Sequence, residues 1–196
     1  MSGMEPRVLY GLVVLFLAGP YGCGTAQTRP ANQQVQMVPV KALPVPTNCG
    51  QVPNHTLPET AQAYRLKSGN YLVSVECTPG AYQSSQVFFL LDRSGESSTA
   101  VLLSFPVLKA DGQGELSLDQ TGEVWGVINI DGDKSMLRVL NRFRALGDCG
   151  ILAEYWIGGA KPVAVEMRLK SECDDREADH PERWQKLDIG KLGRAR

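Results

Sequence analysis

The chain has 196 residues, which suits one domain of ordinary size with a substantial core. A hydrophobic content of 43% and a formal net charge of −1 are typical of a soluble globular protein. They give no indication of nucleic-acid binding, which requires a clustered positive surface. The chain has 20 glycines, 12 prolines and only short apolar runs, which favours an all-β fold over a helical one.

Residues 1–26 are expected to form an export signal. Residues 8–19 are apolar and uncharged, and this run is too short to span a membrane comfortably. An uncleaved buried helix is disfavoured because a Gly-Pro pair ends the run abruptly. Cleavage before Cys23 would give a lipoprotein, although Pro20 stands where a lipobox normally has leucine. Cleavage after Ala26 would give simple secretion; we favour a lipidated Cys23.

The cysteine count agrees with export. Either cleavage removes Cys23 from the free thiols and leaves an even set, which predicts disulfides in an oxidising compartment. Four cysteines allow three pairings. We favour Cys49 with Cys77 and Cys149 with Cys173, because each bond closes a local loop of about 25 residues. There is no C-x-x-C and no histidine at zinc-finger spacing, so we expect neither a metal nor a cofactor.

Residues 24–48 are rich in glutamine and proline and have no sustained period. This composition predicts a flexible tether between a lipid anchor and the domain, or equally a tail without a role. Beyond it, Thr56 and Glu59 fit a capping box with Pro58 in the first turn. A short helix is therefore expected to run toward Tyr64.

From residue 71 onward, short runs of β-branched and aromatic residues alternate with turn residues. This spacing predicts an antiparallel β-sandwich or a partly open barrel, with one or two short helical turns. The expected strands cover residues 71–75, 86–91, 100–105, 115–118, 124–130, 136–140, 151–157 and 162–169.

The last two runs are expected to form a β-hairpin, because they flank the pair Gly158-Gly159, which suits a tight turn. Cys149 precedes the first strand and Cys173 follows the second. The two open ends of a hairpin lie about one strand spacing apart, which is the reach that a disulfide needs. The hairpin therefore supports both the fold class and this pairing.

A single β domain is expected over residues 49–189, followed by a frayed tail at 190–196. The charge-dense segment after Asp174 is interpreted as a solvated surface loop rather than as an acidic docking patch. A proline directly after His180 predicts a helical turn that carries Trp184. We expect this tryptophan to cover an edge of the domain.

Two segments resemble a known family. LGDCG at residues 146–150 is followed by an aromatic strand and a second cysteine, and ECTPGAY at residues 76–82 precedes an apolar strand. Both are similar to segments of the bacterial exported family catalogued as domain of unknown function 1176. Asn129 and Arg142 also fall where that family carries similar residues, whereas Gln83 stands in place of its usual asparagine.

The resemblance covers roughly residues 71–184. It implies an envelope protein with a β-rich fold and disulfides. It implies no activity.

No enzyme template fits the sequence. Neither His55 nor His180 has a context suited to a catalytic triad, and there is no G-x-S-x-G. The turn at Asp131 begins like a calcium loop, but Met136 replaces the required glycine. We therefore predict no catalytic residues. A carboxylate-dependent hydrolase stays an alternative, since distant acidic residues can converge in a fold.

Four residues are candidates for a ligand or partner surface. Asp148 lies in a glycine-rich turn, where its side chain is better suited to a backbone hydrogen bond than to a ligand. Tyr82, Tyr155 and Trp156 are candidates for the floor of a binding groove. Aromatic residues in strands more often pack in the core or across strands, however.

The sequence thus predicts a non-enzymatic binding or assembly module in the periplasm. Lipid on Cys23 would anchor it, and Gly24 after the anchor favours the outer membrane. An envelope protein or a glycan is the expected partner, and no nucleic acid is expected. An inhibitor of a cell-wall hydrolase is an alternative, which predicts a protruding loop with one anchoring side chain.

Overall fold

The computed structural model describes residues 35–52, 55–92, 99–174 and 180–194. The expected export signal with Cys23, and the first part of the expected tether, lie outside the described residues. The described part is all-β, as predicted, and its helices are three short 3-10 turns, η1 (Val40–Ala42), η2 (Pro181–Arg183) and η3 (Ile189–Lys191). Its strands are β1 (Val35–Pro39), β2 (Thr60–Arg65), β3 (Tyr71–Thr78), β4 (Ser85–Asp92), β5 (Thr99–Leu102), β6 (Phe105–Ala110), β7 (Leu116–Thr121), β8 (Glu123–Trp125), β9 (Val127–Asp131), β10 (Met136–Arg142), β11 (Gly150–Trp156), β12 (Val163–Lys170), β13 (Gln185–Lys186) and β14 (Gly193–Arg194).

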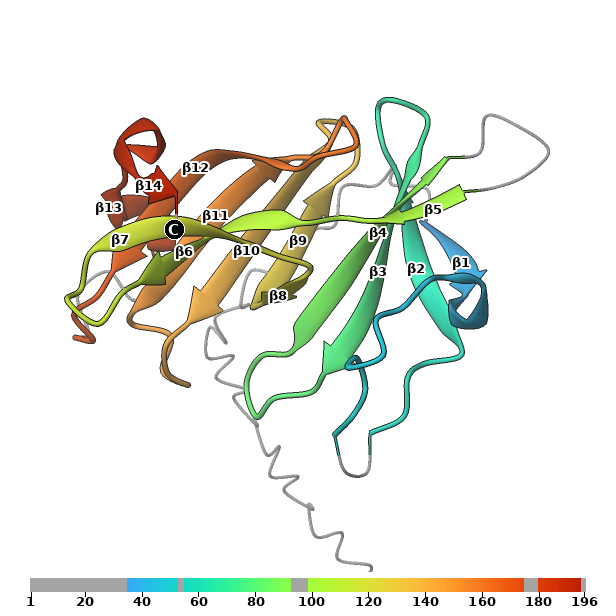
Figure 1. The fold of residues 1–196 in the computed structure, drawn as a ribbon, viewed down its shortest axis with the longest axis horizontal. Helices are drawn as coiled ribbons and strands as arrows, with labels where there is room; N and C mark the ends of the chain where they lie inside the picture. Colours follow the sequence, from blue (N-terminus) through green and yellow to red (C-terminus); the bar gives the residue numbers. More distant parts are fainter. Residues whose placement is uncertain (1–34, 53–54, 93–98, 175–179, 195–196) are drawn as a thin grey trace, which may run out of the picture. The chain divides into compact units, whose positions relative to one another are not determined.

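These strands form three sheets and no closed barrel among the described residues (Figure 1). The first sheet has the order β1-β2-β3-β4-β5, and β8 also pairs with β4. The second has the order β13-β12-β11-β10-β9, and the third has the order β14-β7-β6. The pairing of β14 with β7 is parallel and the others are antiparallel, so the predicted antiparallel architecture is confirmed.

Two hydrophobic cores follow from the period of two along the strands. On β3, Leu72 points into a first core that it shares with Phe88, Phe105, Leu137 and other residues of all three sheets. The residues at the positions in between point to the opposite face of the first sheet, where they form a second core. This second core contains Val73, Val75, Val87, Phe89 and the disulfide-bonded Cys49 and Cys77.

The structure corrects the expected tether from residue 35 onward. β1 pairs with β2 over five residue pairs, from Val35 opposite Tyr64 to Pro39 opposite Thr60. Val38 and Val40 are buried in the second core. In the sequence, the many glutamines and prolines of this segment obscure the pattern of its apolar residues. In the structure, these apolar residues cover a sheet face that would otherwise be open to water.

The helix expected toward Tyr64 is wrong, because this stretch is strand β2. Ala61 and Ala63 are buried at alternate positions, and β2 is hydrogen-bonded to a strand on each side. Hydrogen bonding to two neighbouring strands and a buried face stabilise a strand here more than the local capping signal stabilises a helix. The expected frayed tail is also corrected as far as residue 194, since η3 and β14 continue the fold there.

Two expected strands are each divided in the structure. Residues 100–105 become the end of β5 and the start of β6, and residues 124–130 become β8 and β9. The second division lies at Gly126, where φ is 143° and an added Cβ would lie 2.6 Å from the carbonyl oxygen of Leu140. The chain therefore crosses from the first sheet to the second at a residue that must be glycine.

The predicted hairpin is confirmed as β11 and β12. Its connection spans residues 157–162, so Gly158-Gly159 lie within a longer loop than a two-residue turn. The register also shifts between Glu154 and Tyr155. The turn η2 precedes Trp184 as predicted, and this tryptophan is buried.

Candidate functional site

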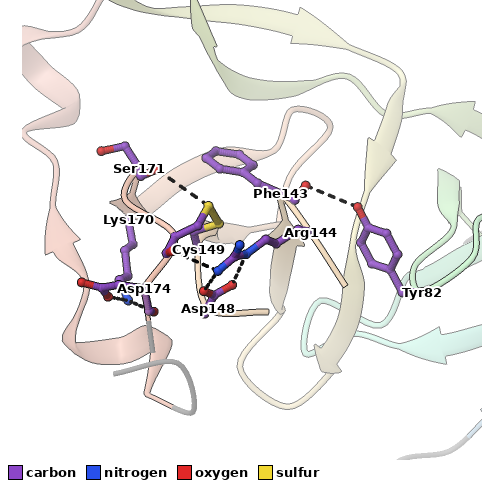
Figure 2. Close-up of a disulfide and its surroundings, with 9 residues drawn as sticks. Tyr82, Phe143, Arg144, Asp148, Cys149, Lys170, Ser171 and Asp174 are labelled. Atoms are coloured by element: carbon purple, nitrogen blue, oxygen red, sulfur yellow. Dashed lines mark hydrogen bonds and ion pairs between the residues drawn. A yellow bond between two sulfur atoms is a disulfide. The ribbon is translucent and has the colours of Figure 1, made fainter. Parts of the chain in front are cut away.

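The open ends of the β11–β12 hairpin are joined by a disulfide. Cys149 and Cys173 are bonded with their Cα atoms 4.8 Å apart, as the hairpin predicted (Figure 2). Immediately beside the bond, Lys170 Nζ lies 2.6 Å from Asp174 Oδ1 and donates to the backbone oxygen of Asp174 at 2.8 Å. The chain is thus held on both sides of Cys173.

Residues 143–149, which we call the clamp loop, are fixed by a second ion pair. Arg144 Nε donates to Asp148 Oδ1 at 2.8 Å, and Arg144 Nη2 donates to Asp148 Oδ2. The same Nη2 donates to the backbone oxygen of Cys173 at 2.9 Å. Figure 2 shows this guanidinium lying between the carboxylate and the disulfide. The clamp loop is therefore tied to the hairpin through one arginine.

Asp148 is only 1% exposed, and hydrogen bonds from the Arg144 guanidinium lower the pKa of its carboxyl below the ordinary value. Its main partner is a side chain rather than the backbone that the sequence analysis favoured. In the sequence, the spacing of four residues between Arg144 and Asp148 was the one signal that could have indicated this pair. Asp148 has a structural role in this arrangement, since both carboxylate oxygens are engaged.

The segment 80–83 meets the end of β10. Gln83 Oε1 accepts from the backbone N–H of Arg142 at 2.9 Å, and Gln83 Nε2 donates to Asn141 Oδ1 at 2.8 Å and to the oxygen of Arg142 at 3.1 Å. Beside it, the Tyr82 hydroxyl donates to the oxygen of Phe143 at 3.5 Å. The end of the ECTPGAY segment and the residue after it are therefore joined to the end of β10 and the start of the clamp loop.

Arg142 lies under the clamp loop. Its Nε is buried and has no hydrogen-bond partner in the part of the chain that the structure describes, and an added Cβ at Gly147 would lie 3.2 Å from that atom. Gly147 also has a φ of 74°, which favours glycine. The glycine of the LGDCG segment thus allows both the turn and the close approach of the arginine.

Several apolar side chains on the segments near this junction are exposed. Leu146, in the clamp loop, is 74% exposed, and Phe143, Tyr82 and Trp125 are also exposed. Trp125 lies beside Gly80, where an added Cβ would be 3.4 Å from its ring. The sequence analysis missed Trp125, because only the pairing of β8 with β4 brings it to the segment that contains Tyr82.

Tyr155 and Trp156 do not join this surface. They are neighbours on β11 and therefore point to opposite faces. Tyr155 is 2% exposed, packs edge-on against Phe105 with ring centroids 5.1 Å apart, and donates to the oxygen of Pro106 at 3.0 Å. Burial raises the pKa of its phenol. Trp156 is 43% exposed and lies over Gly158, at the end of β11 farthest from Cys149.

The described residues contain no group of three histidine, cysteine, aspartate or glutamate side chains that could hold a metal ion. In the same part of the chain, no helix has the length and apolarity needed to cross a bilayer. Of the two histidines, His180 pairs at the surface with Glu182, its Nδ1 lying 3.0 Å from Oε1.

Fold and bonding together define a disulfide-bonded all-β domain. A family model described as "Protein of unknown function (DUF1176)" matches residues 23–187, so the chain belongs to this family and the predicted membership is confirmed. No curated protein and no solved structure shows significant similarity to the chain.

Proposed function

We propose that this protein is an exported envelope protein, anchored by lipid on Cys23, whose β domain is a non-enzymatic binding or assembly module. The observation that supports the proposal is the presence of two disulfides, Cys49–Cys77 and Cys149–Cys173. Such bonds form and persist in oxidising compartments and are rare in the cytosol. They use the four cysteines that remain once Cys23 carries the anchor.

Two carboxylates near the hairpin are held in ion pairs. Asp148 is engaged by Arg144, and hydrogen bonds from Lys186 and Arg168 lower the pKa of Glu166. A general acid at neutral pH needs a raised pKa, which is the opposite shift. These carboxylates therefore suit structural pairing.

Intact mass of the protein from the membrane fraction, measured with and without reductant, tests the proposal. We expect a chain that begins at an acylated Cys23 and that gains two hydrogen atoms per disulfide on reduction. A Cys23→Ser variant is the control, and it should lose the acyl mass and leave the membrane fraction. An unprocessed N-terminus, or a mass that reductant does not change, would contradict the proposal.

A second candidate function is inhibition of an envelope enzyme such as a cell-wall hydrolase. The clamp loop favours it, because one strongly exposed apolar side chain, Leu146, projects from a loop that Arg144, Asp148 and the disulfide hold in place. A preorganised loop of this kind binds with little loss of conformational entropy. It matches the protruding loop with one anchoring side chain that an inhibitor requires.

Capture of lysozyme-like hydrolases by the purified protein tests this candidate. Leu146→Asp should abolish capture, whereas Val163→Asp, at an exposed position on β12 outside the clamp loop, should leave it unchanged. Equal capture by both variants, or no capture by the unaltered protein, would rule the candidate out.

A further inference from the structure

One face of the first sheet changes from apolar to polar partway along its strands. On β3, Leu72 lies in the first core, whereas Ser74 and Glu76 follow on the same face and do not. The neighbouring strands change at the same level, since Gln62 of β2 pairs with Ser74 and Gln86 of β4 pairs with Glu76. Polar side chains from three adjacent strands are thus gathered beyond the end of a hydrophobic core.

A hollow opens over these polar side chains because the chain changes sheets. β8 pairs with β4, but after Gly126 the chain leaves β4 and becomes β9, which pairs with β10. Ile128 and Ile130 of β9 line the resulting groove opposite Ser74 and the polar residues beside it. Its volume is about 340 Å³, and small-molecule sites usually have roughly 300–1,000 Å³.

The two amides in the groove are oriented by neighbouring hydroxyls. The Tyr64 hydroxyl donates to Gln62 Oε1, and Ser74 Oγ donates to Gln86 Oε1. Among the described residues, neither amide nitrogen has a hydrogen-bond partner, and the Glu76 carboxylate has no ion-pair partner. The groove therefore presents two N–H₂ donors and one carboxylate acceptor beside two isoleucines.

This arrangement disfavours an anionic ligand and is only partly satisfied by a cationic one. No lysine or arginine is among the described residues that line the groove, so an anionic ligand would meet Glu76 without compensation. A cationic ligand would pair with Glu76 but would leave the N–H₂ donors of Gln62 and Gln86 without acceptors. A neutral ligand with adjacent hydroxyls, which both donate and accept, satisfies all three polar groups, and its C–H face can pack on Ile128 or Ile130.

We propose that this groove binds a neutral saccharide, with Gln62 and Gln86 donating to its hydroxyl oxygens and Glu76 accepting from its hydroxyl hydrogens. The inference rests on the proposed function as a binding module and names its ligand class and site. It is separate from the clamp loop, which suits a protein partner.

Nuclear magnetic resonance of the exported chain, labelled with ¹⁵N, tests the groove directly. The probes are two neutral trisaccharides, N,N′,N″-triacetylchitotriose and maltotriose, with sialyllactose as an anionic comparison and triglycine as a peptide comparison. We expect at least one neutral trisaccharide to bind saturably and to shift the side-chain N–H₂ signals of Gln62 and Gln86. Sialyllactose and triglycine should shift neither signal.

Matched substitutions separate the groove from the rest of the surface. Gln62→Ala and Gln86→Ala should each weaken binding by about tenfold, the loss expected when a ligand hydrogen bond is removed. Gln113→Ala is the control, because Gln113 is an exposed glutamine in a turn outside the groove. Glu76→Gln removes the carboxylate acceptor, so it should weaken binding of the neutral trisaccharide and lessen the exclusion of sialyllactose. Circular dichroism should show that each variant is folded.

Three outcomes would overturn the inference. These are the absence of saturable binding by both neutral trisaccharides, equal binding by Gln113→Ala and the two groove variants, and preferential binding of sialyllactose or triglycine. The intact-mass measurement keeps this result distinct from the proposed function. A chain that is acylated and disulfide-bonded but binds neither neutral trisaccharide contradicts the saccharide site alone.

Discussion

Arg144 and Asp148 lie four residues apart and form a two-point ion pair against the Cys149–Cys173 disulfide. The guanidinium also donates to the oxygen of Cys173, so one side chain connects the clamp loop to the chain just after β12. The carboxylate is buried and the arginine is partly exposed. This pair therefore couples the position of Leu146 to the covalent frame of the domain.

Asp148→Asn should lower the melting temperature more than Asp119→Asn does. The first substitution weakens a buried carboxylate's two bonds to arginine, whereas Asp119 forms an exposed pair with Lys109, which contributes little. Thermal unfolding followed by circular dichroism measures both. Equal effects would show that the ion pair does not hold the clamp loop.

The same pair should make stability depend on pH in the acidic range. The folded-state pKa of Asp148 is lowered, so its contribution is complete above its unfolded pKa of about 4 and is lost as pH falls through the folded value. Melting temperatures of the unaltered protein and of Asp148→Asn should therefore converge as pH is lowered below about 4. A constant difference between them down to strongly acidic pH would contradict this assignment.

Tyr155→Phe should lower the free energy of unfolding by about 1 kcal/mol, because it removes the donor to the carbonyl of the partly buried Pro106. Tyr82→Phe is the matched control. Its hydroxyl is exposed and makes one long bond, so the change should be within about 0.5 kcal/mol. Urea denaturation measures both variants, and equal losses would refute a special role for the buried phenol.

Tyr155 should also limit stability at alkaline pH. Burial raises its folded-state pKa, so the unfolded chain ionises first, near pH 10, and stability falls as pH rises above that value. Tyr155→Phe should lose stability less steeply over the same range. An ultraviolet titration in which all tyrosines of the folded protein ionise near pH 10 would contradict this expectation.

Much of the fold could be predicted because its signals are local. β3 and β4 are short runs bounded by turn residues, and the hairpin carries a cysteine at each open end. The same local pattern failed at β2, since Ala61 and Ala63 are too small to mark a buried face and a capping box lies just before them. Only the ladders with β1 and β3 reveal this strand.

The functional surfaces were harder to predict because they depend on register. Gln83 reaches Arg142 across 59 positions of sequence, and no local pattern indicates that contact. The groove depends on the pairing of Gln62 with Ser74 and of Gln86 with Glu76 across three strands, which a shift of one residue would destroy. The LGDCG motif singles out Asp148, but its partner Arg144 lies before the motif, so the motif does not predict this pair.

Removal of each disulfide should have a distinct local effect. Replacing either pair by serine should cost roughly 2–4 kcal/mol of unfolding free energy, because each bond restricts a loop of the unfolded chain. Loss of Cys149–Cys173 should speed hydrogen exchange in the clamp loop, whereas loss of Cys49–Cys77 should speed it in residues 47–50, which that bond joins to β3. Mass spectrometry of exchanged peptides measures this difference, and the same exchange pattern in both variants would contradict it.

Gly126→Ala tests whether the change of sheet between β8 and β9 requires glycine. An added Cβ would lie 2.6 Å from the oxygen of Leu140, and φ is 143°, so the variant should lose more than about 1 kcal/mol of unfolding free energy. Gly112→Ala is the control, because an added Cβ there meets nothing within 4 Å. It should change stability by less than about 0.5 kcal/mol. Urea denaturation compares the two variants, and a Gly126→Ala protein as stable as Gly112→Ala would show that the backbone can turn there without glycine.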